Sequence, residues 1–246
     1  MNDERFSEAI AAASHDGGIG TLGEKTLHAV LKYYIEPDPF FHEVSVGGRV
    51  ADIYNEDGIT EIQTRSLERL IKKLPSLLEK AKVTVVFPIP YRKWISWIDP
   101  ATGELSKRRR SPKTGRLFDA LYELGKLKKF IREEGFSVKI MLIDTEEHRN
   151  LDGWGNGGKR GSSRNERFPL RLESETDLKC PEDYRVFLPE DLASPFTIKE
   201  YEKAAKVSYR SAVSGVAILR EAGIVSLCGK RGRENLLIVN RESQAR

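Results

Sequence analysis

The sequence predicts a mixed α/β domain, in which helices cover a sheet, followed by a small C-terminal unit of two helices and two strands. Three observations lead to this prediction. Segments with apolar residues at helical spacing alternate with segments that have the pattern of strands. From about residue 195 the predicted order changes to two helices followed by two strands, which indicates a separate unit. The length of 246 residues, 39% of them hydrophobic, is enough for one large domain and a smaller companion.

Apolar spacing and turn residues place the elements of the main domain, which we expect to cover residues 1–190. Helices are predicted over residues 5–13, 21–35, 65–80 and 115–133. Strands are predicted over residues 40–46, 49–54, 59–64, 83–89 and 137–144. The sequence Asn55-Glu56-Asp57-Gly58 is typical of a turn, so the strands on either side of it should pair as a hairpin.

A second, more exposed hairpin is expected over residues 91–116. It carries a run of basic residues without an acid, and Trp94 and Trp97 lie close by in the sequence. Basic residues interleaved with aromatic rings suit a nucleic-acid backbone and a splayed base. The alternative is a solvated charge run with the tryptophans facing the core. The residues that we expect to bind nucleic acid here are Lys107, Arg108, Arg109 and Arg110.

A glycine-rich stretch over residues 153–165 follows the main-domain strands. Five glycines fall within the nine residues from Gly153 to Gly161, and basic residues such as Lys159 and Arg160 lie among them. Such a composition is typical of a flexible linker or of a mobile loop that closes over a bound substrate. Both interpretations stay open at this point.

The final segment, residues 195–246, has the pattern of a winged helix-turn-helix domain. A short helix over 198–205 precedes a turn, Ser208 can cap a second helix over 209–222, and two strands follow with a basic tip between them. Residues 197–246 hold ten basic residues against five acidic ones, which favours binding of a polyanion. Docking to another protein is the alternative. The residues that we expect to contact nucleic acid are Ser208, Tyr209, Arg210, Lys230, Arg231 and Arg233.

Several classes of protein are disfavoured by the sequence. Its longest apolar stretches are far shorter than the ~20 residues that a membrane helix needs, so we expect no membrane partner. The polar N-terminus lacks the apolar core of a secretory signal, and a cytoplasmic location is expected. Cys180 and Cys228 have neither the number nor the spacing of a disulfide framework or a zinc site.

A pair of carboxylates is the strongest chemical signal in the sequence. If the predicted hairpin pairs across its four-residue turn, Asp52 faces Glu61 on one side of the sheet, and Gln63 projects to the same side. Like charges in this relation are destabilising, so a cation between them is expected. Two carboxylates suit Mg²⁺, which leaves its other positions for water and substrate. The alternative is that the two acids are unrelated charges on a solvated strand.

The segments Val50-Ala51-Asp52-Ile53 and Thr60-Glu61-Ile62-Gln63-Thr64, preceded by a helix that bears Glu24, resemble the restriction-endonuclease-like, or PD-(D/E)XK, nuclease superfamily. The resemblance covers about residues 20–145. It implies a restriction-endonuclease-like mixed sheet flanked by helices, with Asp52 and Glu61 as metal ligands, the Ile62 carbonyl completing the coordination, and Glu24 as a further acid. Glu24 also fits a capping box, Thr21-x-x-Glu24, at the start of its helix.

The resemblance implies a Mg²⁺-dependent (or Mn²⁺-dependent) DNA endonuclease that the winged helix delivers to DNA. Gln63 stands where the superfamily usually has a lysine, and a neutral amide can orient the attacking water but cannot supply charge. The main alternative is therefore a DNA-binding or regulatory protein that keeps the nuclease fold without turnover. RNA is an alternative substrate, and a homodimer is one arrangement that would cut both strands.

Overall fold

The structure is a computed structural model that describes residues 2–15, 26–99, 101–150 and 163–240 of the chain. Its α-helices are α1 (Asn2–His15), α2 (Thr26–Ile35), α3 (Leu74–Leu78), α4 (Leu121–Leu124), α5 (Ile198–Ala205) and α6 (Tyr209–Glu221). Its 3-10 helices are η1 (Pro39–Phe41), η2 (Leu67–Leu70), η3 (Leu117–Ala120), η4 (Gly125–Phe130) and η5 (Pro181–Phe187). Its strands are β1 (His42–Val46), β2 (Arg49–Asn55), β3 (Gly58–Ile62), β4 (Val83–Ile98), β5 (Arg109–Arg110), β6 (Phe136–Asn150), β7 (Ser163–Leu178), β8 (Val225–Arg231) and β9 (Glu234–Val239).

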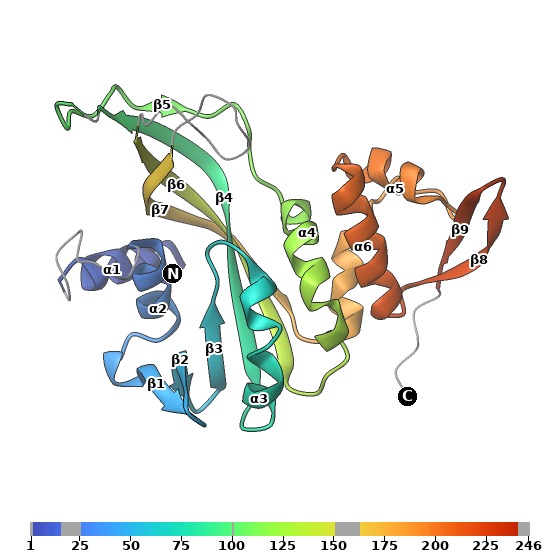
Figure 1. Ribbon diagram of the computed structural model, residues 1–246, viewed down its shortest axis with the longest axis horizontal. Coiled ribbons are helices and arrows are strands. Elements are labelled where there is room, and N and C mark those ends of the chain that lie inside the picture. Colours follow the sequence, from blue (N-terminus) through green and yellow to red (C-terminus); the bar gives the residue numbers. More distant parts are fainter. Residues whose placement is uncertain (1, 16–25, 100, 151–162, 241–246) are drawn as a thin grey trace.

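The main sheet is mixed, as predicted. Its strands follow the order β1-β2-β3-β4-β6-β7, and β5 pairs with β4. The central strands β3, β4 and β6 run parallel, whereas β1, β2 and β7 pair antiparallel with their neighbours. Helices α1 and α2 lie on one face of the sheet, and α3 and α4 lie on the other (Figure 1). The architecture is therefore mixed α/β, with a large sheet flanked by helices.

Alternation along the strands builds a hydrophobic core on each face. On β4, Val83 and Val85 belong to one cluster of buried side chains, and Val86 belongs to the other. The second cluster holds Ile53 and Ile62 of the hairpin together with side chains of α1 and α2. Because successive side chains of a strand point to opposite faces, the central strands separate the two cores.

Strands β4, β6 and β7 are longer than the cores require. They extend past the helices as an arm, which Figure 1 shows at the top of the sheet. The expected break between a strand over 83–89 and a hairpin strand over 91–98 is wrong, because β4 runs through both, with a register irregularity between Pro90 and Lys93. The second hairpin forms around the predicted turn: Ile98 pairs with Leu105 in an antiparallel bridge, and β5 pairs with β4 at Trp94 and Ile95.

The expected helices over 65–80 and 115–133 are wrong as continuous elements. Residues 67–78 form η2 and the short helix α3 with Pro75 in its first turn, and residues 117–130 form η3, α4 and η4. Proline lacks the N–H that a helix interior needs and disfavours helical backbone in the residue before it, so a helix through Pro75 would be broken. No helix in the described part of the chain is long and apolar enough to cross a membrane.

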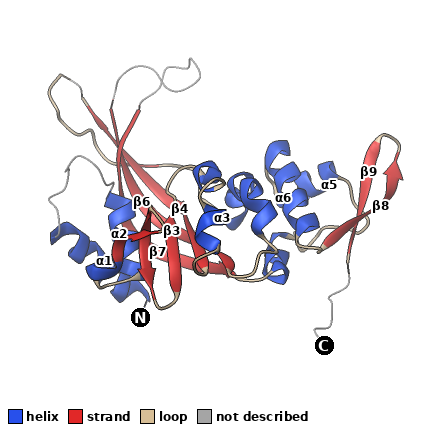
Figure 2. Ribbon diagram, turned by 60° about the horizontal axis from the view of Figure 1, so that its bottom comes forward, coloured by secondary structure: helices blue, strands red, loops and turns tan. Residues whose placement is uncertain are grey.

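The C-terminal elements lie where the sequence predicts them. Helix α5 ends at Lys206, which has a left-handed backbone conformation, and Ser208 caps α6 by accepting a hydrogen bond from the Ser211 backbone N–H. Strands β8 and β9 then pair antiparallel. This unit extends away from the main sheet, with β8 and β9 at its far end (Figure 2).

The C-terminal unit shares one core with the main domain. Leu121 and Leu124 of α4 belong to the same buried cluster as Ala212 and Val216 of α6. The backbones approach closely, since a Cβ built on Gly125 would lie 2.8 Å from the Ser214 Cβ. The two parts are therefore joined by packed side chains as well as by the chain itself.

Candidate functional site

The hairpin holds the two predicted carboxylates together. The register pairs Tyr54 with Ile59 and Ile53 with Thr60, as predicted from the turn. Regular pairing ends there, and the Asp52 Oδ2 accepts a hydrogen bond from the Ile62 backbone N–H at 2.6 Å. The predicted pair of Asp52 with Glu61 is therefore not part of the regular ladder. The Asp52 side chain is tied to the backbone of the residue that follows Glu61.

Glu61 is a buried acid held by a lysine. It is 1% exposed, and its Oε1 accepts a hydrogen bond from the Lys73 Nζ at 2.6 Å. The same Nζ donates to the Val50 carbonyl oxygen at 2.6 Å, so Lys73 connects β2 with β3. Burial raises the pKa of Glu61; the nearby Asp52 carboxylate raises it further, while Lys73 opposes both effects.

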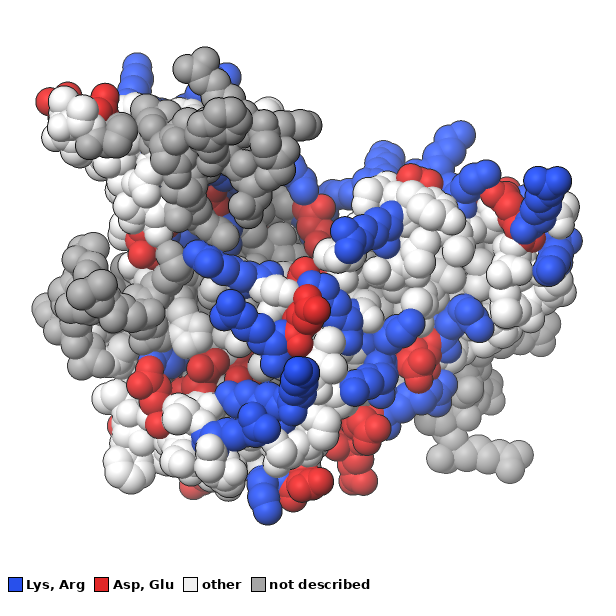
Figure 3. Space-filling model, viewed as in Figure 1, with Lys and Arg blue, Asp and Glu red and all other residues white. Residues whose placement is uncertain are grey.

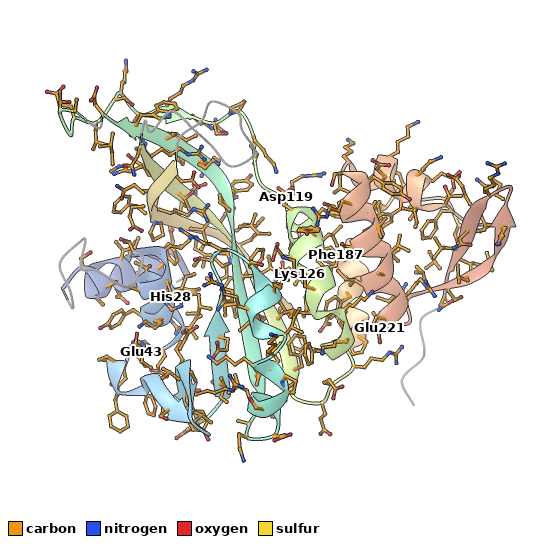
Figure 4. The ribbon with its side chains drawn as sticks, viewed as in Figure 1. His28, Glu43, Asp119, Lys126, Phe187 and Glu221 are labelled. Atoms are coloured by element: carbon orange, nitrogen blue, oxygen red, sulfur yellow. The ribbon has the colours of Figure 1, made fainter. Side chains whose placement is uncertain are left out.

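His28 of α2 approaches the same group from the other side. Its Nε2 lies 3.4 Å from the Asp52 Oδ2, and the two side chains are each 21% exposed. Figure 4 shows His28 between α2 and the hairpin strands. The site therefore combines two carboxylates, one ammonium group and one imidazole from four different elements of the chain.

Of the other residues predicted for the site, the structure describes Gln63 and Ile62 but not Glu24. Gln63 follows β3, and its backbone N–H donates to the Val86 carbonyl oxygen at 2.9 Å, which continues the pleat. Strand alternation then puts Gln63 on the same face as Glu61. Ile62 is 1% exposed, with its side chain in the core against α2. Glu24 lies outside the described residues.

The donor set fits a hard cation. Asp52 and Glu61 carry two negative charges when ionised, and Lys73 supplies one positive charge to them. Within the described ranges, His, Cys, Asp and Glu do not form a group of three or more that could hold a metal ion by themselves. Two carboxylates are nevertheless the usual protein contribution to a Mg²⁺ site, because water and substrate phosphate complete the coordination.

A basic cleft opens beyond the end of β3, next to this group. Its volume is about 520 Å³, and it is lined by Thr64 and Arg65, which follow β3, and by Lys93 and Arg167 of the sheet. Lys113 and Asp119 also line it. Figure 3 shows Lys and Arg side chains gathered across the middle of this face, between the sheet and the C-terminal helices.

The basic hairpin is placed at the edge of the sheet, on the arm. Lys107, Arg108, Arg109 and Arg110 are all exposed. Arg108 also lies over the Trp94 ring, 4.7 Å from its centroid, and its Nε is 3.0 Å from the Glu146 Oε2. Trp94 and Trp97 are half-buried, so neither ring is sealed in the core. All four predicted basic residues thus lie at the surface, and the charge of Arg108 is partly neutralised.

The C-terminal residues predicted to bind nucleic acid differ in their availability. Ser208 and Tyr209 are exposed at the start of α6, but Arg210 stacks on the Tyr122 ring of α4 at 4.1 Å. At the tip between β8 and β9, Arg231 pairs with Glu200 at 2.6 Å. Lys230 and Arg233 are exposed in the same turn region. The buried face of α6 packs on α4, and its opposite face is exposed at Val213 and Arg220 as well as at the N-terminal end.

Lys73 and the buried acid Glu147 were not anticipated from the sequence. Lys73 precedes α3, which packs over the Glu61 face of the sheet. The helix predicted after the carboxylate strand did not indicate which of its lysines would reach Glu61. Glu147 lies on β6, and its carboxylate contacts Arg149 and Arg167. The neighbouring residues of β6 are also charged or polar. The alternation of apolar and polar residues therefore does not show which of these charges is buried.

Comparison with known proteins places these residues within a family. A family model described as a domain of unknown function, DUF8091, matches residues 25–179. The chain belongs to this family. A Treponema pallidum (strain Nichols) protein described as uncharacterized is 30% identical over 225 residues, which cover 89% of this chain and 86% of that protein. No solved structure matches. The DUF8091 match spans α2 to β7, and thus includes His28, Asp52, Glu61 and Lys73, but ends before the C-terminal unit.

Proposed function

We propose that this protein is a metal-dependent nuclease of the PD-(D/E)XK type that hydrolyses phosphodiester bonds in DNA. The observation that carries the proposal is the hydrogen bond from the Ile62 backbone N–H to the Asp52 carboxylate. It ties the acid of β2 to the residue after Glu61 on the antiparallel strand β3, at the end of the parallel centre of a mixed sheet. The helix α2 packs against this point and supplies His28. The arrangement of sheet, helix and acids agrees with the resemblance in the sequence segments 50–53 and 60–64.

The residues at the site have separate tasks in this proposal. Asp52 and Glu61 hold Mg²⁺ or Mn²⁺, which when bound would lower the pKa of a water molecule and neutralise charge on the phosphate. Gln63, on the same face, orients the attacking water through its amide. Lys73 supplies the positive charge that Gln63 lacks, because its ammonium group already contacts Glu61 at 2.6 Å.

The C-terminal unit supports the assignment of a nucleic acid as substrate. Its order of two helices and an antiparallel hairpin is that of a winged helix-turn-helix, in which the second helix and the wing contact DNA. Ser208 and Tyr209 are exposed at the start of α6, and Lys230 and Arg233 are exposed at the wing. Arg210 and Arg231 are exposed too, but each already has a partner within the protein. Ser208, Tyr209, Lys230 and Arg233 therefore carry the contacts in this proposal.

A second candidate function is a DNA-binding protein that keeps this fold without turnover. The hydrogen bond between Lys73 and Glu61 favours it, because an ammonium group beside a buried carboxylate occupies the place of a cation. In this candidate, Lys73 is a structural counter-ion and the basic surfaces alone account for the function.

Cleavage assays with defined substrates separate the two candidates. Supercoiled plasmid, single-stranded DNA and RNA are each incubated with the full chain in Mg²⁺, in Mn²⁺ and in EDTA. We expect metal-dependent cleavage of DNA that Asp52→Asn and Glu61→Gln abolish. Asp57→Asn is the matched control, since Asp57 is an exposed acid in the turn of the same hairpin. Circular dichroism checks that each variant is folded.

The results of these assays test the assigned site, the substrate and the second candidate separately. Cleavage that survives both substitutions refutes the assigned site, and cleavage of RNA alone refutes DNA as the substrate. Salt-dependent DNA binding without cleavage in either metal supports the second candidate. Calorimetric titration with Mn²⁺ gives an independent reading, since Asp52→Asn should weaken metal binding even if turnover is slow.

A further inference from the structure

The basic cleft beyond β3 is lined by more positive than negative side chains, which favours binding of an anion. Four cationic side chains line it, and Asp119 is the one acid among its described lining residues. Asp119 is already engaged, because its Oδ1 pairs with Lys113 at 3.2 Å and its Oδ2 accepts from the Arg116 backbone N–H. Arg65, another lining residue, is exposed and forms no ion pair with a carboxylate within the described part of the chain.

A buried acid organises the cations on the sheet side of the cleft. The Glu147 Oε1 accepts from the Arg167 guanidinium at 2.6 Å, and its Oε2 accepts from Arg149 at 2.8 Å. The Lys93 Nζ lies 3.6 Å from the Glu147 Oε2. One carboxylate thus gathers three cations, and two of them, Lys93 and Arg167, also line the cleft. The group keeps an excess of positive charge in a fixed geometry.

The floor of the cleft strengthens its attraction for an anion. Phe87 and Ile89 contribute apolar surface beneath the charged side chains. An apolar wall lowers the local dielectric constant, so each cation attracts a negative group more strongly than it would on an open surface. The volume of about 520 Å³ admits a phosphate with its sugar.

We propose that this cleft binds backbone phosphates of the nucleic-acid strand that lies across the Asp52–Glu61 site. This inference rests on the proposed function, because it assigns the strand a path from that site along β3. The Cα atoms of Glu61 and Thr64 are three residues apart, so they are separated by at most about 11 Å. This distance corresponds to about three nucleotides at 3.4 Å of axial rise per strand. The cleft therefore holds the strand beside the reacting phosphate and takes no part in the chemistry.

Binding measured in EDTA tests the cleft without hydrolysis. Arg65→Ala and Lys93→Met each remove one cation, and Glu147 keeps both of its arginines in the second variant. Lys80→Ala is the matched control, because Lys80 is an exposed lysine that does not line the cleft. Fluorescence anisotropy with a labelled oligonucleotide duplex gives Kd over a range of salt concentrations. The slope of log K against log salt should fall by about 1 for each cleft variant and stay unchanged for Lys80→Ala.

The same assay identifies the source of the phosphate. Equal affinity for strands with and without a 5′-phosphate is expected for a backbone site. A gain from the 5′-phosphate that Arg65→Ala removes would assign the cleft to a strand end and overturn the proposal. Displacement of the duplex by inorganic phosphate, beyond the effect of chloride at equal ionic strength, would also overturn it in favour of a small-anion site.

The outcome is separable from that of the proposed function. An unchanged salt slope in both cleft variants overturns this inference even if Asp52 and Glu61 prove essential for cleavage. Conversely, a reduced slope together with a lack of cleavage supports the binding path and rejects the nuclease. Melting temperatures of the variants show whether either change acts through folding, and the Arg65→Ala variant, altered only at an exposed side chain, keeps the test valid if Lys93→Met unfolds.

Discussion

Replacing Glu147 by glutamine should lower the free energy of unfolding by about 3 kcal/mol at neutral pH. Glu147 is 1% exposed and accepts hydrogen bonds from Arg149 and Arg167. Burial by itself would raise its pKa, but the two guanidinium groups and Lys93 more than offset this and lower the pKa from 4.5 to about 2. Glutamine would leave these cations without their counter-charge.

The magnitude follows from the difference between the folded and unfolded pKa of Glu147. The difference of about 2.5 units, at about 1.4 kcal/mol for each unit, gives about 3 kcal/mol. Because the folded-state pKa lies below the unfolded one, this stabilisation is fully present above pH 4.5. It is lost as the pH falls from 4.5 through about 2. The difference between wild type and variant should therefore shrink over this acid range.

Urea unfolding followed by tryptophan fluorescence, at pH values from 7 down to 3, measures this difference directly. Glu146→Gln is the matched control on the same strand, since Glu146 is 20% exposed and pairs with Arg108 at the surface. An ion pair of that kind contributes about 1 kcal/mol at most. A loss in Glu147→Gln that equals the control, or that stays constant from pH 7 to pH 3, would refute this account of the cluster.

Two further predictions concern the C-terminal unit. Gly215→Ala should lower the free energy of unfolding by about 1–3 kcal/mol, because its Cβ would lie 2.7 Å from the Tyr201 Oη and 3.0 Å from the Leu121 Cδ1; an unchanged thermal midpoint would contradict this packing of α6. Thr197→Ala should remove about 1 kcal/mol by breaking the capping box with Glu200. Thr197→Ser should keep most of that stability, and equal losses in both variants would argue against the cap.

The hairpin and its acids were predictable because local signals determine them. The turn Asn55-Glu56-Asp57-Gly58 sets the pairing of Tyr54 with Ile59 and of Ile53 with Thr60, the last regular pair before the two acids. Helix α6 was equally accessible, since Ser208 caps its start and Gly223 follows its end. In these cases the residues that decide the structure are near neighbours in the sequence.

The contacts between distant segments were not predictable in the same way. Lys73 reaches Glu61 because the chain after β3 folds back over the sheet, and the 65–80 segment gave no sign of where its lysines would point. Strand β7 was not anticipated, although Phe168, Leu170 and Leu172 alternate with polar residues there. The glycine-rich stretch before it favoured an expectation of irregular structure. Side-chain contacts that form only when distant segments pack together cannot be predicted from the local sequence.

The packing of α6 on α4 has a consequence for how a long ligand would be held. Close packing at Gly125 and Gly215 joins α6 to α4, so the structure sets one separation between the β8–β9 hairpin and the acids of the β2–β3 hairpin. If a duplex contacts both, as the proposed function requires, it must adapt its own curvature to that separation. Flexible sequences would then be favoured over stiff ones even without any contact to their bases.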